Sequence, residues 1–312
     1  MDMPNAGLPA VSWHGEMLSR VFLGTVQLGM DYGIANTQGK PDDRKAAAII
    51  ETAWNLGVCC FDTAQAYGDS ESVLGRTLRE MGVLGEAKVV SKLSAKMDPT
   101  NISQVADSIQ RTFDRLGIDR LWCMMFHQAS WLDHWDQGLG ELLLGYRNAG
   151  RIQHLGVSLN SPDEAHKCLS HPAMDVLQVA CNAWDRRMQR LRVFETAREH
   201  GQLCCVRSIY LQGLLTMQPE SVAQRLPIAR NASVRWHELA AQYGMTTKEM
   251  AIRFALTLDT PLVIGAESAD QIRDTLELAR LRPLQPEIIA TLEQSLGPVV
   301  DDTILTPGRW PR

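Results

Sequence analysis

The most regular feature of the sequence is a series of eight short apolar runs, each with apolar side chains at successive positions. Apolar residues on both faces of a short segment are typical of a strand that is buried on both sides of a sheet. Polar stretches and turn residues separate the runs, so each run can form a strand of its own. The predicted strands cover 21–29, 58–64, 88–93, 121–128, 154–159, 176–182, 203–209 and 261–266.

Segments with apolar residues three and four positions apart lie between these runs, which is the period of a helix buried on one face. Several begin at a capping residue such as Ser70 and end at a glycine such as Gly57, Gly82 or Gly117, as helix ends require. The stretch 212–230, rich in Gln, Pro and Arg, is expected to be a loop. The predicted helices cover 44–57, 70–82, 102–117, 141–150, 162–170, 192–201, 231–244, 247–258, 270–281 and 287–297.

The alternation of strands and helices predicts parallel strands joined by crossover helices. Eight such units in a chain of 312 residues predict an α/β fold of the (β/α)8 TIM-barrel type. We expect one domain over residues 1–312, with the N-terminal segment closing the barrel bottom and extra C-terminal helices beside it. The rival is an open doubly wound sheet, which usually carries a Gly-x-Gly-x-x-Gly turn after its first strand. No such turn follows the first run here.

Composition and charge narrow the function classes. The net charge is −5 and no basic tract is present, which argues against a nucleic-acid partner. The apolar runs are too short to cross a membrane, and the N-terminal residues lack the basic and apolar regions of a secretory signal. Seven cysteines with no Cys-x-x-Cys spacing are typical of buried, reduced thiols in a cytoplasmic protein. No metal site is predicted.

Polar residues stand at the carboxyl ends of the predicted strands. Asp62 ends the second strand, with Tyr67 on the turn after it, and Lys92 and His127 end the third and fourth. In a barrel of parallel strands, these ends open onto one shared mouth. Each residue alone could cap a turn, pack in the core or reach water, but four of them at adjacent strand ends predict a catalytic site. The next two strands add Ser158, Asn160, Gln178 and Asn182.

These residue types suit proton donation to a carbonyl group. The phenol of Tyr67 can protonate a carbonyl oxygen while that oxygen becomes an alkoxide. A nearby Lys92 ammonium favours the phenolate that remains. Asp62 would keep Lys92 charged and in place, and His127 would orient the substrate oxygen through a hydrogen bond.

The residues that carry this chemistry resemble those of the aldo-keto reductase family. The stretch FDTAQAYGDSESVLG at 61–75 is similar to the family's Asp-Thr-Ala…Tyr-Gly…Glu…Leu-Gly signature. The resemblance extends from FLGTVQLG at 22–29 to VIGAESADQIRDTL at 263–276. It implies a nicotinamide cofactor extended across the barrel mouth and a catalytic tetrad with Tyr67 as the general acid, made of Asp62, Tyr67, Lys92 and His127.

The same resemblance implies which residues bind the cofactor. Gly24 and Thr25 match a contact from the first strand, and Ser158 and Gln178 match the pair that holds the nicotinamide carboxamide. Further matches lie around the pyrophosphate and at the adenosine-phosphate end of the cofactor. They are Ser208, Gly213, Gly265, Ala266, Ser268 and Gln271.

The sequence departs from the family pattern at three positions. Arg207 stands where the family usually places an aromatic ring under the nicotinamide, and its flat guanidinium can stack there instead. Thr275 replaces an Asn that often follows the matching Gln by four residues. Glu267 stands near the expected 2′-phosphate, which a carboxylate repels. Family habit implies NADP (NADPH), and Glu267 keeps NAD as the alternative cofactor.

The resemblance implies an NAD(P)-dependent carbonyl reductase that acts on a small polar aldehyde or ketone, sugar-like or from secondary metabolism. Two alternatives stay open. One is an NAD-dependent aldose dehydrogenase, which Glu267 supports. The other is a non-catalytic partner or regulatory subunit that keeps the fold and the tetrad.

Two further segments bear on the substrate. The loop 30–40 is longer than a usual strand–helix connection, and it resembles that of reductases from bacterial carbohydrate and secondary metabolism. Trp131 and Trp135, just beyond His127, are expected either to form an apolar wall of the site or to belong to a surface loop. The polar residues of the long loop are Asp31, Tyr32, Asn36, Gln38 and Lys40.

Overall fold

A closed barrel of eight parallel strands forms the centre of the molecule. In the computed structural model, which describes residues 7–310, the strands follow one another around the barrel in chain order, and the last pairs with the first. This closure confirms the predicted (β/α)8 barrel. The strands are β3 (Val21–Gly24), β4 (Cys60–Asp62), β5 (Lys88–Leu93), β6 (Leu121–Phe126), β7 (Ile152–Leu159), β8 (Val176–Ala180), β9 (Leu203–Arg207) and β10 (Leu262–Gly265).

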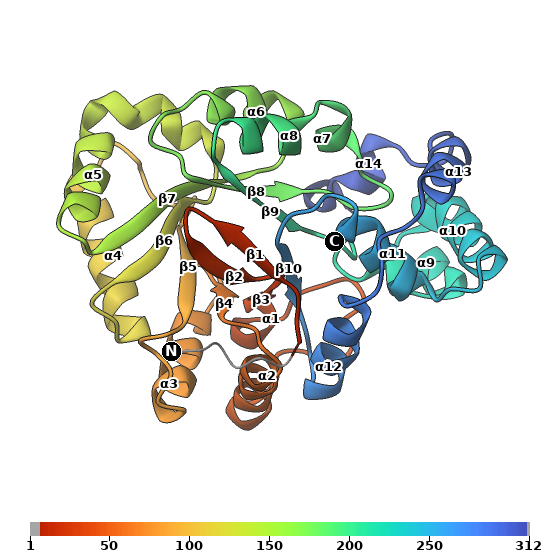
Figure 1. The fold of residues 1–312 in the computed structure, drawn as a ribbon, viewed down its shortest axis with the longest axis horizontal. Coiled ribbons are helices and arrows are strands. Elements are labelled where there is room, and N and C mark those ends of the chain that lie inside the picture. Colours follow the sequence, from red (N-terminus) through yellow and green to blue (C-terminus); the bar gives the residue numbers. More distant parts are fainter. Residues whose placement is uncertain (1–6, 311–312) are drawn as a thin grey trace.

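Helices surround the barrel and connect its successive strands (Figure 1). The longer ones bury an apolar stripe, as α4 does with Val105, Ile109 and Phe113. No helix within residues 7–310 is both long and apolar enough to span a membrane. The outer helices are α2 (Asp43–Asn55), α3 (Ser70–Glu80), α4 (Ile102–Leu116), α5 (Gly140–Asn148), α6 (Pro162–Leu169), α7 (Arg187–Arg190), α8 (Val193–Glu199), α11 (Thr247–Leu256) and α12 (Ala269–Leu278).

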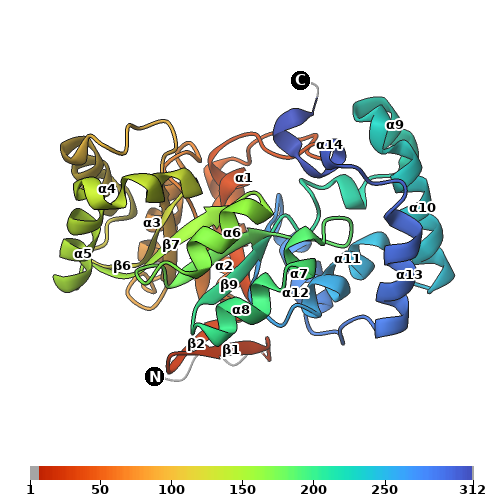
Figure 2. The same cartoon turned by 90° about the horizontal axis from the view of Figure 1, so that it is seen from above.

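A two-stranded antiparallel hairpin closes the bottom of the barrel, as expected for the N-terminal segment (Figure 2). It consists of β1 (Ala10–Trp13) and β2 (Glu16–Ser19). The Glu16 carboxylate accepts hydrogen bonds from the Trp122 indole at 3.0 Å and from the Gln153 amide at 2.5 Å. Both donors stand near the first residues of barrel strands, so the hairpin is held against the end opposite the mouth.

Additional helices lie to one side of the barrel (Figure 2). Two of them, α9 and α10, connect β9 to α11, and the other two follow α12. Helices α13 and α10 pack against each other, so the C-terminal part of the chain is tied to the segment between the last two strands. The bounds of these helices are α9 (Pro219–Arg225), α10 (Arg230–Gln242), α13 (Pro286–Leu296) and α14 (Asp302–Leu305).

The expectation that 212–230 forms a loop is wrong, because α9 lies within it. Pro219 occupies the first turn of this helix and Glu220 follows it, and both residue types favour a helix start. Val222 is fully buried and anchors the helix.

The chain also contains shorter helical turns. One, Trp135–Leu139, is of the π type. The others are 3₁₀ turns at Ala129–His134, Leu214–Thr216, Pro227–Ala229 and Pro307–Arg309.

The first apolar run contains two elements rather than the single strand expected over 21–29. Strand β3 stops at Gly24, and the short helix α1 (Val26–Gly29) follows. The chain turns at Thr25, whose backbone N–H and side-chain hydroxyl both donate to the carbonyl of Asp62 at 2.9 Å. Apolar spacing cannot separate a short buried helix from a buried strand, so this boundary depends on contacts with a neighbouring strand.

Candidate active site

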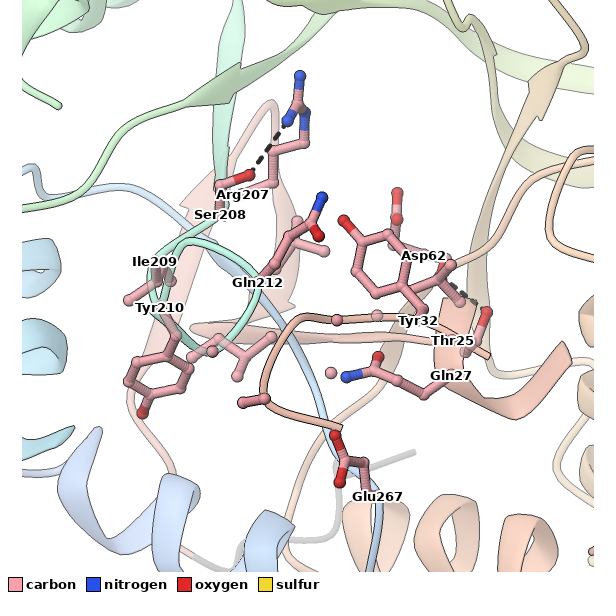
Figure 3. A pocket seen from close by; sticks show the side chains of 18 of the residues that line it. Thr25, Gln27, Tyr32, Asp62, Arg207, Ser208, Ile209, Tyr210, Gln212 and Glu267 are labelled. Atoms are coloured by element: carbon pink, nitrogen blue, oxygen red, sulfur yellow. Dashed lines mark hydrogen bonds between the residues drawn. The ribbon is translucent and has the colours of Figure 1, made fainter. Parts of the chain in front are cut away.

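A cavity of about 630 Å³ opens at the carboxyl ends of the barrel strands (Figure 3). Active sites of such barrels lie at this end, and the volume is within the usual range of cofactor and small-molecule sites. Asp62, Tyr67 and His127 of the predicted tetrad line it. The residues predicted from the family resemblance that also line it are Gly24, Thr25, Ser158, Gln178, Arg207, Ser208, Gly213, Gly265 and Gln271.

Lys92, the remaining member of the tetrad, is fully buried next to Asp62. Its ammonium group donates to both carboxylate oxygens of Asp62 at 2.7 Å and to the carbonyl of Thr63 at 2.9 Å. Burial acts to lower the pKa of Lys92, but the charge of Asp62 and the neighbouring Tyr67 outweigh it and hold this pKa above its ordinary value. Lys92 is therefore a permanent cation beside the cavity.

Tyr67 is half-buried between Lys92 and His127. The Lys92 ammonium nitrogen lies 5.0 Å from the centre of the Tyr67 ring. The rings of Tyr67 and His127 meet edge to face with their centres 5.7 Å apart. The structure thus brings together the four side chains that the sequence predicted as a catalytic group.

The turn that presents Tyr67 is held by close backbone packing against α1. A Cβ atom at Gly29 would lie 1.8 Å from the Tyr67 carbonyl oxygen, and one at Gly68 would lie 2.1 Å from the Gly29 carbonyl oxygen. The Ser70 hydroxyl donates to Thr25 Oγ1 at 2.7 Å. Only glycine fits at these two contacts, so the sequence of the turn and of α1 places the phenol.

His127 is a neutral imidazole at ordinary pH. Burial lowers its pKa to about 3, with the charges of Lys92 and Arg207 acting in the same direction. Its Nδ1 atom is buried and has no hydrogen-bond partner within residues 7–310. A neutral imidazole beside Tyr67 can donate a hydrogen bond to a substrate oxygen. It is a much weaker acid than a protonated imidazolium would be.

Arg207 is held in a fixed position across the cavity from Glu267 (Figure 3). Its guanidinium donates to the Leu159 carbonyl at 3.0 Å and to Asn160 Oδ1 at 2.6 Å. Further bonds reach Ser208 Oγ at 3.1 Å and Ser158 Oγ at 3.4 Å. These contacts come from the ends of β7 and β9, which lie on either side of β8, and together they fix the plane of the guanidinium.

The site contains residues that sequence reasoning did not assign to it. Gln27, Gln212 and Lys248 line the cavity together with Tyr32 from the long loop. Burial raises the pKa of Tyr32, and the neighbouring Tyr67 adds to this shift. Gln27 lies within the FLGTVQLG stretch at 22–29, and this position was the one signal in the sequence that could have identified it. Lys248 comes from a helix more than a hundred residues away from that motif in the chain, and no local pattern could have identified it.

The long loop 30–40 is ordered by its own polar residues. Asp31 accepts a hydrogen bond from the Lys40 backbone at 2.6 Å, and Asn36 Oδ1 accepts two backbone bonds at 2.9 Å. The Lys40 side chain forms an ion pair with Asp69 at 2.6 Å. Of the loop's polar residues named in the sequence analysis, only Tyr32 lines the cavity; Asp31, Asn36 and Lys40 hold the loop over it.

The whole barrel, from its first strand to α13, matches a known family. Residues 20–296 fit the sequence profile of the aldo/keto reductase family. The chain belongs to this family. The family resemblance inferred from the sequence is therefore confirmed.

Relatives of this aldo/keto reductase include enzymes with small polar substrates in their names. It is 22% identical to the L-glyceraldehyde 3-phosphate reductase of Escherichia coli O157:H7, over 88% of this chain and 89% of that one. It is 26% identical to the 2,5-diketo-D-gluconic acid reductase B of Corynebacterium sp. (strain SHS752001), over 88% of both chains. The structure of the glycerol dehydrogenase AKR11B4 from Gluconobacter oxydans superposes with a TM-score of 0.75 at 21% identity, covering 94% of this chain and 97% of that one.

Several residues expected at the cofactor of this aldo/keto reductase are engaged within the protein. The Gln178 side-chain amide donates a hydrogen bond to the Asp62 carboxylate at 2.6 Å. The Ser158 hydroxyl oxygen accepts a hydrogen bond from the Arg207 guanidinium at 3.4 Å. Ala266 and Ser268 do not line the cavity; Ala266 is buried, and the Ser268 hydroxyl caps α12 by accepting from the Gln271 backbone at 3.2 Å.

Trp131 and Trp135 form no wall of this aldo/keto reductase site. Both are absent from the lining of the cavity. Trp131 is buried with its ring centre 5.6 Å from that of Phe126, and Trp135 meets the same ring edge-on at 6.5 Å. Because Phe126 is the last residue of β6, both tryptophans pack outside the strand whose following residue, His127, enters the cavity.

Proposed function

We propose that the protein is an NAD(P)H-dependent carbonyl reductase that converts a small polar aldehyde or ketone to an alcohol, with Tyr67 as the general acid. The observation that carries this proposal is the charged Lys92–Asp62 pair buried beside Tyr67. A buried cation next to a phenol stabilises the phenolate left after proton donation. No packing requirement explains such a pair at the mouth of the barrel.

The proton path begins at Tyr67, which lines the cavity. As the carbonyl oxygen gains negative charge, Tyr67 donates its proton to that oxygen. Lys92 stabilises the resulting phenolate, and Asp62 keeps the ammonium group fixed. The neutral His127 orients the same oxygen by a hydrogen bond, because it stands edge-on to the Tyr67 ring.

The lining of the cavity fits a nicotinamide dinucleotide. The buried atoms His127 Nδ1 and Gln27 Oε1 lack partners within residues 7–310, and a bound ligand would supply them. Ser158 and Gln178 would hold the carboxamide, Arg207 would lie flat under the ring, and Ser208 and Gly213 would hold the pyrophosphate, with the adenosine end near Gly265 and Gln271. When bound, the reduced cofactor supplies the hydride that the carbonyl carbon accepts.

The proposed substrate is small and polar. More polar than apolar side chains line the cavity, and the polar ones include Asn160 and Gln212. The names of the relatives, which specify a phosphorylated triose, a sugar acid and glycerol, support the same class. The proposed compartment is the cytoplasm, because all seven cysteines are free and buried and reducing compartments maintain such thiols.

Steady-state oxidation of NADH and of NADPH with a panel of short hydroxyaldehydes and sugars tests this function. We expect turnover with at least one aldehyde, and its loss in the Tyr67→Phe protein. Absence of turnover in the parent protein, although it binds a reduced dinucleotide, would favour the non-catalytic alternative. Cofactor oxidation that persists unchanged in Tyr67→Phe would refute the proposed acid.

A further inference from the structure

The chain contains two pairs of adjacent cysteines, and the structure treats them differently. Cys59 directly precedes β4 and Cys60 begins it (Figure 1), and their sulfur atoms share a hydrogen bond at 3.6 Å. Cys204 and Cys205 both lie within β9, where successive side chains leave the strand on opposite faces. Because Cys59 lies outside its strand, its side chain does not follow this alternation and meets that of Cys60.

The surroundings of Cys59 favour its thiolate. The hydrogen bond from the Cys60 thiol lowers the pKa of the Cys59 thiol, and Ser19 and the positive charge of Lys88 act in the same direction against burial. Burial and the bond to Cys59 raise the pKa of Cys60 well above its ordinary value. The pair thus places a nucleophilic sulfur beside a protonated thiol, which are the two groups that join when a dithiol is oxidised.

The position of the pair limits the size of a reactant. Cys59 is 3% exposed and Cys60 is 0% exposed. The backbone N–H of Cys59 donates to Ser19 Oγ at 3.2 Å, so the pair lies where the closing hairpin meets the barrel. A site this enclosed admits a small oxidant such as hydrogen peroxide rather than a bulky disulfide. Exposure alone would favour the other pair, since Cys204 is 5% exposed.

We infer that Cys59 and Cys60 form a peroxide-sensitive dithiol, and that its oxidation to a disulfide loosens the start of β4. The Cys59 thiolate attacks one oxygen of the peroxide and becomes a sulfenic acid, while the O–O bond breaks and the other oxygen leaves as water after taking up a proton. The Cys60 sulfur then attacks the sulfenic sulfur, and the hydroxyl leaves with the Cys60 proton as a second water. The two electrons that the sulfurs lose reduce the peroxide.

The disulfide would change the backbone between the two cysteines. A bond of about 2 Å requires the sulfurs to move together, and adjacent Cα atoms, only about 3.8 Å apart, are closer than those of most bridged cysteines. The peptide between them must therefore rotate. Its carbonyl, that of Cys59, accepts from the Lys88 N–H at 2.8 Å, so the rotation breaks a bond between neighbouring strands. Asp62 ends the same short strand, so the disturbance begins close to the tetrad.

Mass spectrometry of the parent protein after brief treatment with hydrogen peroxide tests the inference, independently of the proposed function. The tryptic peptides 46–76 and 199–207 each contain one cysteine pair and no other cysteine, so one digest reports on both. We expect peptide 46–76 to lose two hydrogens and to regain them with dithiothreitol, while peptide 199–207 stays a dithiol. Oxidation of 199–207 to the same extent, or of neither peptide, would overturn the inference.

Variants separate the roles of the two thiols. In Cys60→Ala, the sulfenic acid of Cys59 should persist and be captured by dimedone, and at pH 7 it should form about tenfold more slowly because the thiolate fraction falls. Cys59→Ala should give neither product. Cys205→Ala is the matched control, since it makes the same change in the other pair and should leave oxidation of peptide 46–76 unchanged. Dimedone capture on Cys60 in Cys59→Ala at the rate of the parent protein would overturn the assignment of the nucleophile.

Hydrogen exchange tests the effect on β4. The Lys88 amide, which donates to Cys59 in the reduced protein, should exchange at least about tenfold faster after oxidation, because its acceptor is lost. The Leu203 amide, which donates to the Asp175 carbonyl at 2.9 Å at the start of β9, is the control and should keep its rate. Unchanged exchange at Lys88 in protein that carries the disulfide would overturn the proposed loosening of β4.

Discussion

The ammonium group of Lys92 lies 2.7 Å from both carboxylate oxygens of Asp62, and the side chains of the two residues are 0% and 4% exposed. Neither charge reaches water, so each depends on the other and on the bonds from Thr63 and Gln178 described above. Removing only one of the two charges strongly destabilises the folded protein, because the remaining charge stays buried without a partner. This relationship connects the stability of the barrel with the chemistry of Tyr67.

Replacing Lys92 by Met should lower the free energy of unfolding by about 3–5 kcal/mol, because Asp62 loses its cation. Urea denaturation followed by circular dichroism measures this. The Asp62→Asn/Lys92→Met double variant should recover part of the loss, since no charge is then left buried. The matched control is Asp43→Asn, which breaks an ion pair with Arg76 whose side chains are 46% and 67% exposed and should change stability far less. A double variant less stable than Lys92→Met would contradict the account.

Removing the phenol oxygen of Tyr67 should abolish proton donation while the ring keeps its packing. We expect Tyr67→Phe to lower turnover by roughly 10²- to 10⁴-fold, which is the usual contribution of general acid catalysis. The dissociation constant for the reduced cofactor should stay close to that of the parent protein. Tyr146→Phe makes the same chemical change on α5, outside the cavity, and should leave turnover at the parent value. Aldehyde reduction at the parent rate in Tyr67→Phe would show that another group donates the proton.

The free energy of unfolding should decrease at acid pH because His127 becomes protonated in the unfolded chain. The pKa of His127 is about 3 in the folded protein and about 6.5 in an unfolded chain, so the unfolded state binds more protons between these values. Stability therefore rises with pH over this window and is lost as pH falls from about 6.5 towards 3. His127→Asn should show a shallower decrease between pH 7 and pH 5 in urea titrations. An unchanged slope would mean that His127 is accessible to protons in the folded state.

The close approach of α1 to the Tyr67 turn predicts a large effect for a small change. Gly29→Ala should destabilise the protein and lower turnover together, because the added methyl group would collide with the Tyr67 carbonyl and with the backbone nitrogen of Ser70, 2.6 Å away. Gly145→Ala is the control: this residue lies within α5 with nothing near its Cβ position, and the change should stabilise the helix by about 0.5–1 kcal/mol. Full activity of Gly29→Ala would show that the turn can shift without displacing the phenol.

The sequence and the structure contributed to different parts of the site. The eight strands and the meeting of Asp62, Tyr67, Lys92 and His127 could be predicted, because buried strands, capped helices and the FDTAQAYG turn each leave a local pattern. The boundary at Gly24 and the helix α9 could not, because both depend on hydrogen bonds or burial supplied by distant segments. The choice between a wall of the site and a surface loop for Trp131 and Trp135 could not be made from the sequence for a related reason, since the direction of these side chains follows from packing on Phe126.

The order of the strands, and with it the meeting of Asp62, Lys92 and His127, followed from the sequence alone, since eight strand–helix units of this length close in chain order and open their polar ends on one side. Only the tertiary structure brought Gln27 and Glu267 into the lining of one cavity, because they follow the first and the last strand of the barrel, and those strands become neighbours when β10 pairs with β3. Closure of the sheet brings first and last strands together, and no pattern along the sequence reports which side chains then share one cavity.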